Sequence, residues 1–154
     1  MQPWAAVAGF AFLLHFAWEM WQAPMYRTMV RASHLEAVRV CSFATLGDAG
    51  IQLLAFAAAA VAAGSRLWLA RPRRTPMIVY LVVGLLITVV LEWVNVYVLR
   101  RWAYMEQMPV VLGIGIAPML QWLVIPPVVL WLAARHLGFR IRAVPNATGI
   151  LPDR

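Results

Sequence analysis

The residues with the clearest chemical potential are an imidazole and a carboxyl group inside an apolar stretch. His15 and Glu19 lie four positions apart in a segment that is otherwise apolar from 3 to 23. Residues at i and i+4 share one face of a helix. Ionisable groups are costly inside a bilayer, so they indicate a functional site when they occur there. We therefore take His15 and Glu19 as the first members of a candidate site.

Two further acids also lie inside apolar stretches. Asp48 falls in the stretch 42–63, and Glu92 falls in the stretch 77–99. A rise of about 1.5 Å per residue places these two and Glu19 each roughly 6 to 9 Å from the middle of its stretch. Because successive helices run in opposite directions, all three acids fall in the same half of the bilayer. The sequence therefore predicts that three helices bring carboxyl groups together inside a bundle.

The composition excludes an ordinary soluble domain. Of the 154 residues, 64% are hydrophobic and 12% are charged, whereas soluble domains are about half apolar and a quarter charged. The net charge of +7 comes from arginines between and after the apolar stretches, where they meet lipid headgroups. No basic groove or recognition helix is evident, so we expect no nucleic-acid partner. The single cysteine, Cys41, allows no internal disulfide bond.

Four apolar stretches are long enough to cross a bilayer, for which about 20 residues are needed. A further segment alternates arginines with apolar residues, which is typical of an amphipathic segment in the membrane interface. We therefore expect an all-α, polytopic integral membrane protein with a single domain. The predicted four-helix transmembrane bundle covers 1–136, with spans at 3–23, 42–63, 77–99 and 108–134, an amphipathic interfacial segment at 25–40 after the first helix, and a cytoplasmic tail at 137–154.

The arginines also predict the orientation. Four spans place both termini on one side, and that side carries eight arginines while the other carries five. The positive-inside rule therefore favours cytoplasmic termini. The acids would then lie in the outer half of the bilayer.

Other polar, aromatic and small residues could complete the site. Amides can orient carboxyl groups, indole rings can contact an apolar ligand, and glycine allows close backbone approach. Pro118 would free the carbonyl of Ile114 from a helical hydrogen bond. The predicted ligand-binding residues are His15, Trp18, Gln22, Trp93, Asn95, Gly115 and Gln121.

Four kinds of chemistry fit this set. His15, Glu19, Asp48 and Glu92 include the ligand types of a divalent metal site, although the spacing matches no established metal motif. The same acids could bind a proton, another ion or a hydrophobic small molecule. They could also fix the bundle by hydrogen bonds across helices, as in a homo-oligomer or a subunit of a membrane complex.

An enzyme is the fourth alternative. Glu19, Asp48 and Glu92 could act as acid and base on an isoprenoid-like or sterol-like substrate, with indole rings stabilising a developing cation. The layout is similar to that of sterol-isomerase-type (EXPERA) four-helix proteins, whose polar residues project into a lipid-accessible cavity. This is a likeness of layout and not of motifs.

Several short motifs together resemble a group of small uncharacterised bacterial inner-membrane proteins with four helices. The resemblance covers most of the chain up to about Pro127 and implies a polytopic bacterial protein, but it implies no reaction. The motifs are Trp18-Glu19, Gln22-x-Pro24-x-Tyr26, Gly47-Asp48, Glu92-Trp93-x-Asn95-x-Tyr97, Trp102-x-Tyr104, Met108-Pro109 and Gly113-Ile114-Gly115-x-x-Pro118-x-x-Gln121-Trp122.

Overall fold

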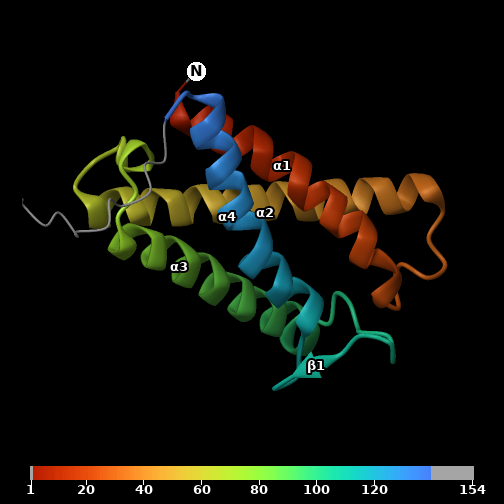
Figure 1. Ribbon diagram of the computed structural model, residues 1–154. Coiled ribbons are helices and arrows are strands. Elements are labelled where there is room, and N and C mark those ends of the chain that lie inside the picture. The colour runs from red at the N-terminus through yellow and green to blue at the C-terminus, as the bar shows by residue number, and fades with distance from the viewer. Residues whose placement is uncertain (1, 140–154) are drawn as a thin grey trace, which may run out of the picture.

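The computed structural model describes residues 2–139 and is mostly helical, with four long helices (Figure 1). The predicted all-α class is confirmed. The predicted tail lies outside the described residues from position 140 onward. The elements are α1 (Pro3–Gln22), a 3₁₀ turn η1 (Ala23–Met25), α2 (His34–Ala63), a 3₁₀ turn η2 (Trp68–Ala70), α3 (Arg74–Trp93), a π-helical turn η3 (Val94–Val98), β1 (Val110–Val111), β2 (Ile114–Gly115) and α4 (Ile116–His136).

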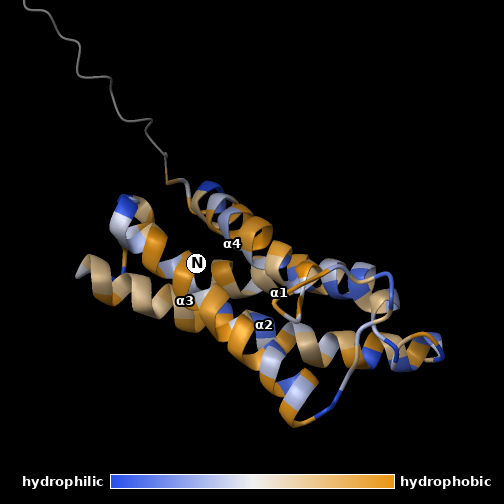
Figure 2. Cartoon of the chain, turned by 90° about the horizontal axis from the view of Figure 1, so that it is seen from below, coloured by the Kyte–Doolittle hydropathy of each residue, from blue (hydrophilic) through white to orange (hydrophobic). Residues whose placement is uncertain are grey.

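Three of the helices are long and apolar enough to cross a membrane. They are α2, α3 together with its π-helical turn, and α4. The apolar run of α1 is interrupted by His15 and Glu19, and α1 is not among the three. Hydrophobic residues cover long stretches of the helices, while many of the hydrophilic residues gather in the connections and at helix ends (Figure 2).

The helices form a closed ring of neighbours. α1 packs against α2 and α4, and α3 also packs against α2 and α4. The N-terminus, the end of α2 and the start of α3 lie toward one end of this bundle, which we call the near end (Figure 1). The connections α1–α2 and α3–α4 lie at the opposite end, which we call the far end.

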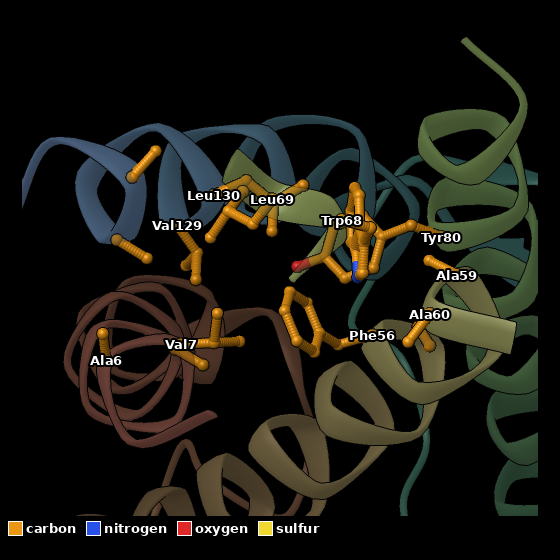
Figure 3. Close-up of a cluster of buried hydrophobic side chains, with 14 of the residues drawn as sticks. Ala6, Val7, Phe56, Ala59, Ala60, Trp68, Leu69, Tyr80, Val129 and Leu130 are labelled. Atoms are coloured by element: carbon orange, nitrogen blue, oxygen red, sulfur yellow. The ribbon is translucent and has the colours of Figure 1, made fainter. Parts of the chain in front are cut away.

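The near half of the bundle has an apolar core. Figure 3 shows Phe56 of α2 and Trp68 of η2 among aliphatic side chains of α1 and α4. The rings of Phe56 and Trp68 have centroids 5.1 Å apart. The Trp68 side chain is buried in this core and does not reach a membrane interface.

The start of α2 corrects one prediction. Ser33 and Glu36 form a capping box, in which the Ser33 backbone N–H donates to the Glu36 carboxylate over 2.8 Å. This cap satisfies free N–H groups at a helix start, so α2 already begins at His34. The predicted amphipathic segment 25–40 is therefore not a separate element. It is divided between a loop and the first turns of α2.

The start of α4 differs from the predicted start of the fourth span. The fourth span was predicted from position 108, but α4 begins at Ile116, after a small antiparallel hairpin of β1 and β2. Leu112 and Gly113 form its turn with φ values of 51° and 82°, the left-handed pair that tight hairpins require. Pro118 therefore lies in the first helical turn, where no intrahelical N–H bond is lost, and it frees no carbonyl.

Candidate functional site

A buried polar layer crosses the middle of the bundle. It contains His15 of α1, Gln52 of α2, Tyr80 of α3 and Gln121 of α4, so each helix contributes one side chain. The Gln52 side-chain oxygen accepts from His15 Nε2 over 2.7 Å, and the Gln52 amide nitrogen donates to the Tyr80 hydroxyl over 2.6 Å. We call these four residues the polar layer.

The His15 ring is engaged on both nitrogens. Because Nε2 donates to Gln52, Nδ1 accepts, and the Gln121 amide nitrogen lies 2.7 Å from it. Trp122 covers the ring with centroids 5.5 Å apart. These contacts fix one tautomer of a neutral imidazole. His15 therefore serves here as a hydrogen-bonded joint between α1, α2 and α4.

Two of the predicted acids meet beside this layer. The Gln121 amide nitrogen donates to Asp48 over 2.9 Å and lies 3.3 Å from Glu19 Oε1. Gln22 donates to the same Glu19 oxygen over 2.7 Å. Trp18 in turn donates to the Gln22 side-chain oxygen over 3.2 Å. The carboxyl groups of α1 and α2 are thus brought together by amides, and Gln121 connects them to His15 of the polar layer.

The third acid is held by two tyrosines. Tyr26 and Tyr104 both donate to Glu92 Oε1, over 3.2 Å and 2.8 Å respectively. Within the described residues, Glu92 Oε2 has no hydrogen-bond partner. Tyr26 is buried, and its ring packs edge-on to that of Trp102 with centroids 6.4 Å apart.

Burial raises the pKa of both tyrosines above the ordinary value of a phenol. Both lie in the connections outside the helices, and loss of hydration is the largest cause of the raised pKa of Tyr26 and of Tyr104. The negative charge of Glu92 raises both values further. The two hydroxyl groups therefore keep their protons at neutral pH and remain hydrogen-bond donors to Glu92.

All three acids line one cavity of about 490 Å³ at the far end of the bundle. The lining is mostly apolar, with polar groups from all four helices and from the connection after α3. We call this space the acidic cavity. Its polar and charged lining residues are Glu19, Gln22, Tyr26, Thr28, Cys41, Asp48, Thr88, Glu92, Asn95, Arg101, Trp102 and Gln121.

The two far-end connections are tied to each other beside this cavity. The Arg27 backbone N–H donates to Ala103 O, and Met105 N–H donates to Met25 O, each over 2.9 Å. The Arg27 Nε also donates to the Tyr104 carbonyl over 3.0 Å. These bonds hold Tyr26 and Tyr104 in place over Glu92.

Three polar atoms of the cavity lining are buried without a partner within the described residues. They are Thr88 Oγ1, Asn95 Oδ1 and Trp102 Nε1. Buried polar groups are nearly always hydrogen-bonded, and an unpaired one costs about 1 to 3 kcal/mol. These atoms therefore indicate a place where a bound polar molecule could form the missing hydrogen bonds.

The predicted site residues divide between the cavity and its surroundings. Glu19, Asp48, Glu92, Gln22, Asn95 and Gln121 line the cavity. His15 lies behind it in the polar layer, and Trp18 reaches it only through Gln22. Trp93 is half exposed and pairs with Tyr97, while Gly115 packs against Tyr104 and Met108, so neither lines the cavity.

Asn95 was predicted to orient an acid, but in the structure it does not. Its amide nitrogen donates to the Leu91 carbonyl of its own helix over 2.7 Å. It lies in the π-helical turn that continues α3, and such turns are frequent at functional sites. Its oxygen is left for another partner.

The predicted metal site is not formed by the residues that were expected to bind the metal. Within the described residues, no group of three or more His, Cys, Asp and Glu side chains is arranged to hold a metal ion. His15 and Asp48 come within 3.7 Å, but His15 Nδ1 and Nε2 are both used by amides. Glu92 accepts from two tyrosines at Oε1 and is not grouped with other ligands in a way that would hold a metal ion within the described residues.

Sequence reasoning missed several members of the site. Gln52 is a polar residue in an otherwise apolar run, four positions after Asp48, and that spacing predicts a shared helix face. Thr88 similarly precedes Glu92 by four positions. Tyr80 gave no such signal, since tyrosine is ordinary near a helix end.

Comparison with protein-family models, with curated proteins and with solved structures finds no match for this chain. Its function must therefore be argued from its own residues.

Proposed function

We propose that this chain is a multi-pass protein of the bacterial inner membrane that binds a small molecule in the acidic cavity. Three helices support a membrane location by length and composition. α1 is the proposed fourth span, because its 20 residues would reach about 30 Å and it packs between α2 and α4. The arginine distribution supports cytoplasmic termini, which would place the cavity in the outer half of the bilayer.

The observation that carries this proposal is the convergence of Glu19, Asp48 and Glu92 on one cavity. Its volume of about 490 Å³ lies in the range of small-molecule sites and is far larger than a bare ion needs. Mostly apolar walls with a few convergent polar groups are typical of such sites. A hydrophobic or amphiphilic molecule is therefore the ligand that the cavity suits best.

Acid–base catalysis is the second candidate. Glu19 and Asp48 accept from the same amide of Gln121, so two carboxyl groups stand close enough to exchange a proton through a bound substrate. A lipid-phase substrate would enter the same cavity. Glu19→Gln should then abolish turnover while leaving binding within a few-fold, whereas a pure binding protein would show no turnover to lose.

The single cysteine provides a test of the proposed cavity. Cys41 lines it and is buried, so we expect methyl methanethiosulfonate to reach the thiol in the folded protein in phosphatidylcholine nanodiscs. Gly47 also lines the cavity, and no atom lies within 4 Å of an added Cβ there. Gly47→Phe should therefore fill the space and slow the labelling of Cys41 about tenfold.

Gly50 is the matched control, because it lies on the same helix with equal room for a Cβ but does not line the cavity. Gly50→Phe should leave the labelling rate within about twofold. A Cys41 that reacts only after unfolding, or that reacts equally fast in both variants, would refute an accessible cavity.

A further inference from the structure

We infer that the ligand of the acidic cavity carries a primary ammonium group on an apolar body, and that Thr88, Glu92 and Asn95 receive this group. The inference rests on the proposed binding function and names the chemical class of its ligand. It is carried by one face of α3, by the missing counter-charge and by the apolar walls of the cavity.

The receiving residues form a stripe along the end of α3. Thr88, Glu92 and Asn95 follow one another at spacings of four and three, so they share one helix face, and all three line the cavity. Thr88 Oγ1 and Asn95 Oδ1 have no partner within the described residues, although Thr88 is only 8% exposed. Both tyrosine bonds to Glu92 end on Oε1, and the Trp102 side chain lies beside the same carboxyl group.

All three of these atoms are oxygens that can accept a hydrogen bond. The Asn95 amide nitrogen is already used by the Leu91 carbonyl, so its oxygen is the free part of the side chain. A primary ammonium group carries three N–H donors and no acceptor. One such group could serve Thr88, Glu92 and Asn95 together. The other unpartnered atom, Trp102 Nε1, is a donor and takes no part in binding an ammonium group.

Among the described residues, no arginine forms an ion pair with these acids. Within the described residues, the one ion pair of a cavity acid is that of Asp48 with His15 at 3.7 Å, and neutral His15 carries no charge. Arg101 lines the cavity and forms no ion pair with any acid in the described part of the chain, and Arg27 Nε donates to the Tyr104 carbonyl. Charges inside a bilayer are expected to be paired. A ligand cation would supply the missing partner for Glu92.

The two tyrosine donors strengthen this assignment. Tyr26 and Tyr104 stabilise negative charge on Glu92 through Oε1, so Oε2 is the carboxylate oxygen that remains for a ligand. The rings of Tyr26 and Trp102 also line or border this end of the cavity, where aromatic faces attract cations. A quaternary ammonium group would gain from the rings but would leave the three acceptors unpaired.

The rest of the lining suits an alkyl chain. Val40, Phe43, Ile51 and Leu91 are apolar lining residues. Phe43 and Val40 are 71% and 52% exposed on α2, so in a bilayer this side of the cavity faces lipid. An amphiphile could therefore enter from the membrane with its ammonium group leading toward α3.

Protection of Cys41 tests the ligand class directly. The wild-type protein in phosphatidylcholine nanodiscs is labelled with methyl methanethiosulfonate in the presence of decylamine, decyltrimethylammonium, decanol or decanoate. Each charge-assisted hydrogen bond is worth roughly tenfold in affinity. We expect decylamine to protect Cys41 at concentrations at least about tenfold lower than the other three probes.

Variants assign the receiving residues. Asn95→Leu and Glu92→Gln should each raise the decylamine concentration needed for half protection about tenfold, whereas the exposed loop variant Glu106→Gln should not change it. Equal protection by decylamine and decyltrimethylammonium would show that charge alone matters and would overturn the role of the acceptor stripe. Equal protection by decanol would overturn the ammonium class while leaving the cavity as a binding site.

A complete lack of protection would separate the two proposals. If no probe protects Cys41 but Gly47→Phe still slows labelling, the ammonium inference fails and the accessible cavity stands. If Gly47→Phe has no effect either, both proposals fail.

Discussion

The polar layer and the acidic cavity are neighbouring regions that differ in how many of their buried polar atoms have hydrogen-bond partners. In the polar layer, both nitrogens of His15 and both ends of the Gln52 amide have partners. In the cavity, Thr88 Oγ1 and Asn95 Oδ1 are buried and have no hydrogen-bond partner within the described residues. A membrane interior offers no water to make up the difference. The first region therefore joins the helices, whereas the second leaves room for the ligand that we propose.

Gln121 joins the two regions. Its amide nitrogen contacts His15 in the layer and both Asp48 and Glu19 at the cavity wall. The structural and binding hypotheses thus apply to adjacent sets of residues and need not compete. Substitutions that separate stability from binding will show whether this division is correct.

The largest expected effect on stability is that of Gln52→Leu. The change would leave His15 Nε2 and the Tyr80 hydroxyl without partners in the described structure. Each buried unpaired group costs about 1 to 3 kcal/mol, so we expect a loss of about 2 to 6 kcal/mol. The free energy of unfolding can be measured by titration with sodium dodecyl sulfate in mixed micelles, followed by tryptophan fluorescence.

Gln107→Leu is the control for that measurement, since Gln107 lies in an exposed connection and should change stability by less than about 0.5 kcal/mol. A Gln52→Leu protein as stable as the wild type would remove the structural role of the polar layer. It would also remove the contrast between the two regions.

The sequence predicted much of the fold because apolar length is a strong signal. Each predicted stretch overlaps one of the four helices, and the helix-direction argument placed Glu19, Asp48 and Glu92 at one level, where the structure brings them to one cavity. It failed at 108–115, where an apolar run hides a hairpin whose turn depends on Leu112 and Gly113 adopting positive φ. Hydropathy carries no information about such backbone conformations.

The site was predicted less completely than the fold. Depth along a helix follows from counting residues, but rotation about the helix axis depends on packing. Trp93 and Glu92 are adjacent in sequence, yet Trp93 is half exposed while Glu92 is buried. The pairing of Glu92 with Tyr26 and Tyr104 depends on two connections meeting at the far end, which no local pattern specifies.

A smaller effect should distinguish tight packing near the polar layer from open space in the cavity. A Cβ at Gly84 would overlap the ring of Trp122, which itself covers His15. Gly84→Ala should therefore cost about 1 to 3 kcal/mol through overpacking. Gly47→Ala meets no atom and should stabilise α2 by about 0.5 to 1 kcal/mol, because alanine favours a helix over glycine. Equal losses in both variants, measured by the same unfolding titration, would contradict an open cavity.

The smallest expected effect concerns pH at the cavity wall. Burial holds the pKa of Tyr26 and Tyr104 above the usual phenol range, whereas an unfolded chain ionises its tyrosines near pH 10. Their contribution to stability is therefore complete below about pH 10 and is lost as the pH rises above it. In the folded protein, Tyr26→Phe and Tyr104→Phe should each leave unchanged the tyrosinate absorbance that develops up to about pH 11. A smaller amplitude in either variant would mean that its hydroxyl is hydrated and is not the buried donor that holds Glu92 in place.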